Sequence, residues 1–496
     1  MGPIEFVALL LAGVGPLLAL SHALRLPATV VLFAAGLGAG LLPGPAPVRV
    51  DPDLVIWLFL PPVIYAGTVR VTPHLLRVTL LPGVLVGVVT SLCIVLAVAV
   101  VLRMLLLPGL GWTAALALGV VAALFDTRLF HEADGRPHVP RALGDALKAR
   151  EMAARVTALV ALKLTLDALA AGQAPGLGEA VLDIAWSLAC GAAVGAVIAR
   201  AVLWLRDRAG PAPVEIAVSL ATPYLTALAA RGLGLSLAVA VIAAALTVAA
   251  ARVDRKTGEA RSSAEARITA AAFWEELSLI ASSVLFFLAG LALPDAWASL
   301  GDWPGWRTAG AAAGIVIIAL ALQGVGSLVS TRLPPLRDAL EGPGSTLRAA
   351  GVMAWASTQS VLGLVVALSI PPAARSGELF SERGLVVVVA SLVILSSVAV
   401  QGLTLRAAVR HAGLGGEDEA QREEEEARNA AAAARQEAPA EDTHPDSLAA
   451  ERRALLHLRE HDEIGDEALR SLLREADLRD RAAEGDGRTG AGPPNP

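Results

Sequence analysis

Several ionisable side chains stand inside stretches that are otherwise apolar, and these residues are the ones that could do chemistry. Asp126 lies in AALFDTRLF, which is apolar up to the carboxylate and polar after it. Glu151 and Arg155 are four residues apart, so they share one face of a helix, with Arg150 beside them. An acid and a guanidinium in such surroundings form either a mutually neutralised brace or part of an ion pathway.

Other ionisable groups in apolar stretches favour structural roles. Two of them, Lys163 and Asp167, are one helical turn apart and can neutralise each other. Groups near the end of an apolar stretch can reach toward water. A carboxylate further inside can brace a neighbouring helix, which is the role we expect for Glu275. The residues with these structural interpretations are Lys163, Asp167, Asp183, Glu215, Glu275 and Glu276.

The elements that carry these residues belong in a membrane. The chain has 496 residues, 55% hydrophobic and only 17% charged, with a mean hydropathy of +0.62. Soluble proteins are about a quarter charged, so the composition excludes a soluble enzyme and a nucleic-acid binder. Cys93 and Cys190 lie in apolar runs, which excludes a disulfide framework and a cysteine metal site. We expect no cofactor.

Thirteen apolar runs are long enough, or nearly so, to cross a bilayer as helices. Pro61 and Pro62 should kink the third, because proline removes a backbone donor. Gly36 and Gly40 in the second form a small-residue packing signal that is more often intramolecular. The runs are 4–23, 26–44, 54–69, 80–102, 110–130, 147–171, 178–203, 213–230, 233–251, 267–293, 308–331, 349–371 and 384–405.

The basic residues between these runs set an orientation. With a cytoplasmic C-terminus, the inner connections and the start of the tail hold 21 Arg and Lys and the outer connections hold six. We therefore expect an N-terminus outside and a C-terminus in the cytoplasm, in a multi-pass protein of the plasma membrane.

The tail after the last run is a separate region. We expect residues 1–410 to form the transmembrane domain, 411–448 an acidic, Ala-rich flexible linker, 449–482 a cytoplasmic helical hairpin and 483–496 a disordered C-terminus. The hairpin is indicated by leucines at helical spacing on both sides of Gly465.

Several stretches together resemble the bacterial monovalent cation/proton antiporters, which are related to the eukaryotic sodium/hydrogen exchangers. These are LRLPATVVLFAAGLGAGL at 24–41, LFLPPVIYAG at 58–67, the two-helix stretch 214–250, FWEELSLIASSVLFFLAGLAL at 273–293 and the C-terminal ERRALLHLREHDEIGDEALRSLLREADL. The resemblance runs over nearly the whole chain.

The resemblance implies an all-α inverted-repeat fold of about 13 transmembrane helices, with two interrupted helices crossing at the ion site. It also implies a homodimer that exchanges sodium or potassium for protons, an activity that serves pH homeostasis. Such exchange requires a carboxylate that holds a proton or a cation but not both.

The ion site departs from the family pattern. Asp126 matches the aspartate of the family's Thr-Asp-Pro, with Phe125 and Thr127 on either side. Val139 and Pro140 match a family Val-Pro at the same spacing and fix the register of the next helix. Through that register, the family's essential aspartate falls on Arg155 and its buried glutamate on Arg150.

Two further positions have changed with them. The arginine that pairs with the buried glutamate in the family falls on Gln359, and an ion-ligating serine falls on Glu151, a new carboxylate.

Two interpretations follow. In the first, Asp126 and Glu151 are the exchanging carboxylates, Arg155 tunes them, and the transported monovalent cation is the site's only metal. In the second, Arg155 fills the cation site and pairs with Asp126. A guanidinium does not deprotonate, so that protein would carry an anion or another substrate, or act as a non-transporting sensor or scaffold.

Overall fold

The structure of the protein is a computed structural model. It describes residues 3–24, 26–42, 52–69, 80–127, 141–171, 176–208, 212–251, 264–301, 303–334, 336–339, 345–373, 380–413, 417–437, 444–460, 463–464, 468–469 and 471–479. Val139 and Pro140, and the predicted disordered segment 483–496, lie outside these residues.

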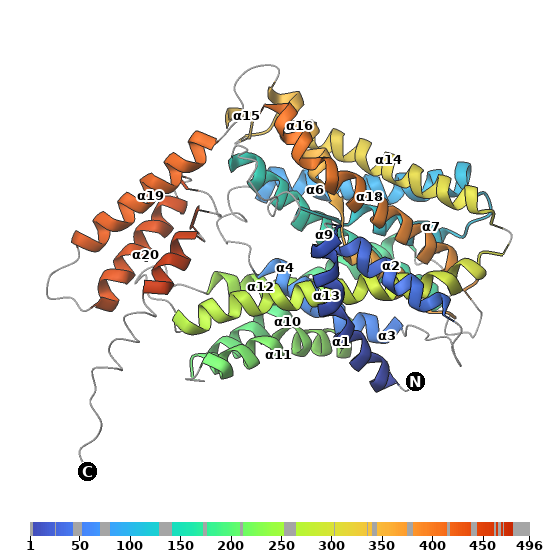
Figure 1. Cartoon of the computed structure of the whole chain (residues 1–496), viewed down its shortest axis with the longest axis horizontal. Helices are drawn as coiled ribbons and strands as arrows, with labels where there is room; N and C mark the ends of the chain where they lie inside the picture. Colours follow the sequence, from blue (N-terminus) through green and yellow to red (C-terminus); the bar gives the residue numbers. More distant parts are fainter. Residues whose placement is uncertain are drawn as a thin grey trace, which may run out of the picture.

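The described chain is almost entirely helical (Figure 1), as the composition predicts. The elements are α1 (Pro3–Leu24), α2 (Ala28–Leu41), α3 (Pro52–Leu54), a π turn η1 (Val55–Phe59), α4 (Leu60–Thr68), α6 (Leu80–Val101), a π turn η2 (Leu102–Leu106), α7 (Trp112–Ala123), β1 (Phe125–Asp126), α9 (Arg141–Ala171), α10 (Leu177–Arg206), α11 (Ala212–Gly232), α12 (Leu237–Ala250), α13 (Ala264–Ala298), α14 (Gly305–Ser330), α15 (Leu336–Ala339), α16 (Ser345–Ala356), β2 (Thr358–Gln359), α17 (Leu362–Leu368), α18 (Arg383–Ala412), α19 (Glu417–Glu437) and α20 (His444–Glu460).

Each of the thirteen predicted runs contains a helix of the structure. Within the described residues, six helices are long and apolar enough to span a membrane, and five more apolar helices are shorter. One group of helices, α10, α11 and α12, packs together, as does a second group, α6, α14 and α16. Helix α9 contacts α6, α7 and α12, so the helix that carries Glu151 and Arg155 lies in the interior of the bundle.

The third run changes from π-helix to α-helix where its prolines stand. The π turn η1 ends at Phe59, and α4 begins at Leu60, so Pro61 and Pro62 occupy its first turn. The first backbone N–H groups of a helix have no partner within it, so proline costs little at this position. The expected kink at these prolines stays a prediction.

Glycines bring α2 and α13 into direct backbone contact. A Cβ on Gly36 would overlap the carbonyl oxygen of Phe287, and a Cβ on Gly290 would overlap the carbonyl oxygen of Phe33. Gly40 faces the Leu291 carbonyl in the same way. The small-residue signal of the second run is therefore intramolecular, as predicted.

Helices α7 and α16 both end in extended chain, and the two extended pieces meet at a place that we call the crossing. The chain is extended after α7 at Phe125 and Asp126, and again after α16 at Thr358 and Gln359. The two extended pieces form an antiparallel pair in which Phe125 faces Gln359 and Asp126 faces Thr358. Interrupted backbone at this depth is tolerated only where other groups satisfy its N–H and C=O groups.

The tail forms a small helical unit beside the bundle, on the left in Figure 1. Residues 417–437, expected within a flexible linker, form helix α19. The Ala-rich sequence has high helix propensity, and Ala427 and Ala431, one turn apart, are buried against Leu455 of α20 and Leu472. Helical residues 471–479 complete the predicted hairpin, whose first helix α20 begins at His444.

Candidate ion site at the crossing of two interrupted helices

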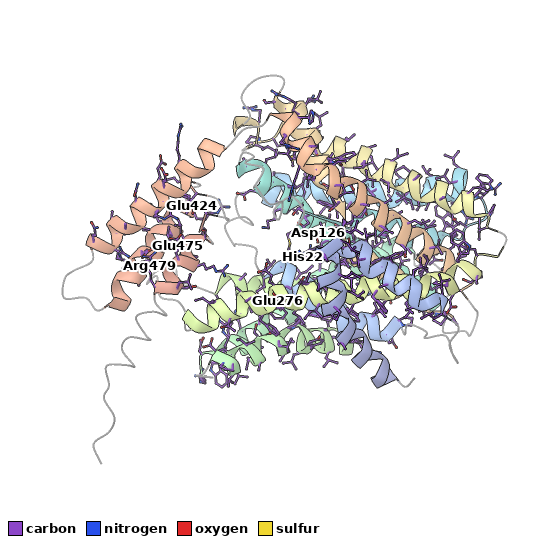
Figure 2. The ribbon with its side chains drawn as sticks, viewed as in Figure 1. His22, Asp126, Glu276, Glu424, Glu475 and Arg479 are labelled. Carbon is purple, nitrogen blue, oxygen red and sulfur yellow. The ribbon has the colours of Figure 1, made fainter. Side chains whose placement is uncertain are left out.

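Hydrogen bonds from both side chains and backbone hold the two extended segments together at the crossing. The Thr358 hydroxyl donates to the Asp126 carbonyl at 2.9 Å, and the Ser360 N–H donates to the Leu124 carbonyl at 3.0 Å. The Gln359 N–H donates to Ser397 Oγ of α18 at 2.9 Å. These contacts satisfy groups that a broken helix leaves open, and they fix Asp126 at the centre of the bundle (Figure 2).

Gln359 adds a second link with its side chain. Its amide Nε2 donates to the carbonyl of Ala122 in the last turn of α7 at 3.4 Å. Its Oε1 is buried without a hydrogen-bond partner among the described residues. The C-termini of α7 and α16 both end at the crossing, where their partial negative charges favour a cation. The unpartnered amide oxygen is a further acceptor for one.

Glu151 lies against the crossing from α9. It is buried, with 7% of its surface exposed, and accepts a hydrogen bond of 2.6 Å from Thr127 Oγ1, next to Asp126 in the chain. The charges of Asp126 and Lys148 are close enough to act on its carboxylate. Glu151 therefore lies against the segment that carries Asp126.

Arg155 pairs with Glu151. Its Nη2 forms a buried salt bridge with Glu151 Oε1 one helical turn away, as the spacing predicts. On the other side, a Cβ on Gly67 of α4 would lie only 2.7 Å from Nη1, so a side chain there would make the guanidinium shift. The second interpretation expects Arg155 to pair with Asp126. Among the bonds described for Arg155, the acidic partner is Glu151.

Arg150 points elsewhere, into the interface of α9 with α14. It is fully buried and donates to Ser327 Oγ at 2.6 Å, to Gln323 Oε1 at 2.6 Å and to the Gln323 carbonyl at 3.3 Å. Its acceptors in the described chain are neutral. Sequence reasoning missed Gln323 and Ser327, although a glutamine within the apolar run of α14 was a visible signal.

The remaining ionisable residues have partners away from the crossing. Lys163 bonds Asp167 at 2.8 Å, as expected, and also Asp183 of α10 at 2.6 Å. We expected Glu215 to extend toward water. It is instead buried and forms an ion pair with Arg206 at 3.8 Å.

Glu275 and Glu276 of α13 lie outside this network. Both side chains are exposed on the helix. Among the described residues no hydrogen bond joins Glu275 to a neighbouring helix, so its bracing role stays a prediction. The buried neighbour Trp274 donates to Ser219 Oγ at 3.3 Å and packs on Tyr65.

Comparison with known proteins identifies the family. Residues 7–411 match the family described as "Sodium/hydrogen exchanger, transmembrane". An uncharacterized Na(+)/H(+) exchanger of Mycobacterium tuberculosis is 29% identical over 407 residues, covering 79% of this chain and 71% of the relative. A sodium, potassium, lithium and rubidium/H(+) antiporter of Bacillus pumilus is 23% identical over 395 residues, covering 77% of this chain and 57% of the relative.

A solved structure shows the same fold. The sodium proton antiporter MjNhaP1 from Methanocaldococcus jannaschii superimposes with a TM-score of 0.59 at 16% identity, covering 83% of this chain and 98% of that one. With its apolar helices, this chain is an integral membrane protein of antiporter fold. The match over residues 7–411 shows that the chain belongs to the sodium/hydrogen exchanger family, a family of transporters.

Proposed function

We propose that the protein exchanges a monovalent cation, sodium or potassium, for protons, with Asp126 and Glu151 as the exchanging carboxylates. The observation that carries the proposal is the hydrogen bond from Thr127 to Glu151, which holds Glu151 against the residue that follows Asp126 in the chain. A carboxylate there can hold a proton or a cation but not both, and this competition couples the two fluxes.

Arg155 has a defined part in this cycle. As a permanent cation it neutralises Glu151 while no substrate is bound, which limits the cost of burying that charge. An entering cation or proton displaces the guanidinium from Glu151 or binds at Asp126 beside it. Arg155 therefore acts as an internal counter-charge, and its position beside Gly67 is part of the site.

Ion-driven proton flux in proteoliposomes tests the exchange, with sodium, potassium and lithium gradients applied in turn. Asp126→Asn should abolish cation-driven flux. Asp167→Asn is the matched control, since it makes the same change on α9 at a carboxylate paired with Lys163, and should transport normally. Flux that persists in Asp126→Asn, or no cation flux in folded wild type, contradicts the proposal.

The salt bridge of Arg155 with Glu151 also supports a second function, a non-transporting sensor or scaffold whose core is locked by its own arginine. Buried Arg459 of α20 bonds Asp145 of α9 at 3.0 Å, which links the tail to the helix that carries the pair. Wild type without cation flux, in protein shown to be folded, favours this function.

We further propose that the protein is a homodimer in the plasma membrane, with its tail in the cytoplasm. The distribution of basic residues supports the orientation, and the family supports the assembly. A membrane-impermeant thiol reagent should label a cysteine introduced in α19 only after cells are opened.

A further inference from the structure

We propose that the last turns of α10 bind the headgroup of an anionic phospholipid, through Arg200 and Arg208 on either side of Trp204. Arg200 and Trp204 are four residues apart, so they share one face of the helix, and Arg208 follows after another four. All three side chains are exposed. The span Val181–Arg206, which is long and apolar enough to cross a membrane, ends between Trp204 and Arg208. The three residues therefore lie where an apolar helix leaves the membrane.

Two tryptophans of α10 indicate the level of the headgroups. Trp186 is 63% exposed and Trp204 is 59% exposed. They are 18 residues apart, which is five helical turns and about 27 Å of helix, so they lie on the same face near its two ends. The hydrocarbon core of a bilayer is about 30 Å thick, and tryptophan is enriched at both of its interfaces. Trp204 is therefore at the level of the lipid headgroups.

Arg208 is held at Trp204. Its guanidinium carbon lies 4.0 Å from the centre of the indole ring, and its Nη1 donates to the Trp204 carbonyl at 2.9 Å. A guanidinium has five N–H groups in a planar fork that matches the oxygens of a phosphate. The bond to Trp204 uses one nitrogen, so the fork can still bind a phosphate at the level of the headgroups.

Arg200 lies further inside the span, and it lacks an acidic partner. Ionisable side chains within a membrane usually face the interior of the bundle or pair with another group. Arg200 instead lies on the exposed face, and it forms no ion pair among the residues that the structure describes. Arg206, by contrast, pairs with buried Glu215 of α11 at 3.8 Å. The phosphate of a lipid is the anion that a bilayer supplies here, and the long stem of arginine can reach it.

The charges at this end of α10 favour a lipid with a net negative headgroup. The acidic residues nearby are Asp207, next to Arg208 in the chain, and Glu215, which pairs with Arg206. Helix α12, which packs on α10, has no ionisable side chain. With the orientation proposed above, the two guanidinium groups face the cytoplasmic leaflet, whose anionic lipids attract basic residues. A zwitterionic lipid would bring a second cation together with its phosphate.

Fluorescence quenching of Trp204 tests the proposal in bilayers. The full-length protein is reconstituted in phosphatidylcholine with rising fractions of phosphatidylglycerol that is brominated near the top of its acyl chains. The quenching that Trp204→Phe removes belongs to this site. Brominated phosphatidylglycerol should reach half of that quenching at a mole fraction about 25-fold below that of brominated phosphatidylcholine, from roughly fivefold for each basic residue. Equal mole fractions for the two lipids overturn the proposal.

Variants assign the preference to the two arginines, each compared with its own Trp204→Phe counterpart. Arg200→Gln and Arg208→Gln should each lower the preference for phosphatidylglycerol about fivefold. Arg200→Lys keeps the charge and should keep the preference. Arg422→Gln, which removes the same charge from an exposed position of α19, is the control and should behave as wild type. A preference that survives in both glutamine variants, or that falls as much in Arg422→Gln, overturns the assignment.

Inorganic phosphate separates a lipid site from a general anion site. Sodium phosphate, with sodium chloride holding the ionic strength constant, should not displace the brominated lipid, and displacement overturns the proposal. Both arginines are exposed, so glutamine at either position should not prevent folding. If Arg200→Gln fails to fold, Arg208→Gln against wild type still decides. The proposal does not depend on cation exchange, so protein without cation flux gives the same test.

Discussion

The hydroxyl of Thr127 is the contact that holds Glu151 against the crossing. Thr127→Val keeps the shape and removes the 2.6 Å bond to the carboxylate, so it should destabilise the protein by about 1.5–3 kcal/mol, the range for a hydrogen bond to a charged group, and slow transport. Thermal unfolding in detergent and proteoliposome flux measure the two effects.

Thr165→Val is the control for this change. Thr165 lies on α9, and its hydroxyl donates to the Ala161 carbonyl of its own helix. A loss in Thr165→Val as large as that in Thr127→Val would mean that the hydroxyl at the crossing has no special role.

The guanidinium of Arg155 lies close to the backbone of Gly67. Gly67→Ala places a methyl group 2.7 Å from Nη1, so the guanidinium must move and stability should fall. Combined with Arg155→Gln the loss should shrink, with a coupling of about 0.5–3 kcal/mol in a double-mutant cycle.

Gly351→Ala checks the effect of the methyl group alone. Gly351 lies in α16 with open space around it, so alanine there should be neutral or stabilising by up to about 1 kcal/mol. Additive effects of Gly67→Ala and Arg155→Gln would contradict the contact.

At the scale of elements, the crossing depends on α18 as well as on the two interrupted helices. Ser397→Ala removes the acceptor of the Gln359 N–H and leaves a buried donor unsatisfied, which should cost about 1–3 kcal/mol. The neighbouring Ser396, whose hydroxyl bonds the Val393 carbonyl of its own helix, is the control. Equal stability of Ser397→Ala and Ser396→Ala in thermal unfolding would show that α18 does not support β2.

The helices themselves follow from the sequence, and their breaks follow only in part. Apolar length predicted each of the thirteen segments, because a bilayer requires satisfied backbone over about 20 residues. The change from apolar to polar residues at Asp126 is typical of a place where a helix ends inside a membrane. The break after Ala356 came only from resemblance, since WASTQS is as polar as many helix interiors and it is the pairing with Phe125 that makes it extended.

At the scale of the whole molecule, the tail is joined to α9, the helix that carries Glu151 and Arg155. Within the tail, Glu451 accepts two bonds from Arg479, at 2.9 and 2.7 Å, and Arg428 lies 2.9 Å from Glu475; Figure 2 marks Arg479 and Glu475 in this unit. The Glu475 carboxylate raises the pKa of Arg428 above its usual value. The unit therefore has its own core and ion pairs, and Arg459 attaches it to Asp145.

Asp145→Asn should release the tail without unfolding it. The change removes the negative charge that faces buried Arg459, so the tail should separate from α9 while Leu455 and Leu472 stay packed. Hydrogen exchange should rise around Arg459 and in the first turns of α9, and stay low in the core of the tail. Asp167→Asn should change neither, and unchanged exchange near Arg459 in Asp145→Asn would contradict the attachment.

The sequence by itself determined the class of fold, the helices and the family, because these depend on apolar length, local spacing and motif. The i,i+4 pair of Glu151 and Arg155 was equally local. Tertiary structure alone decided that Thr127 binds Glu151, that Arg150 binds Gln323 and Ser327, and that Gly67 faces Arg155. Those contacts join segments distant in the chain, and no local pattern specifies which buried polar group satisfies another.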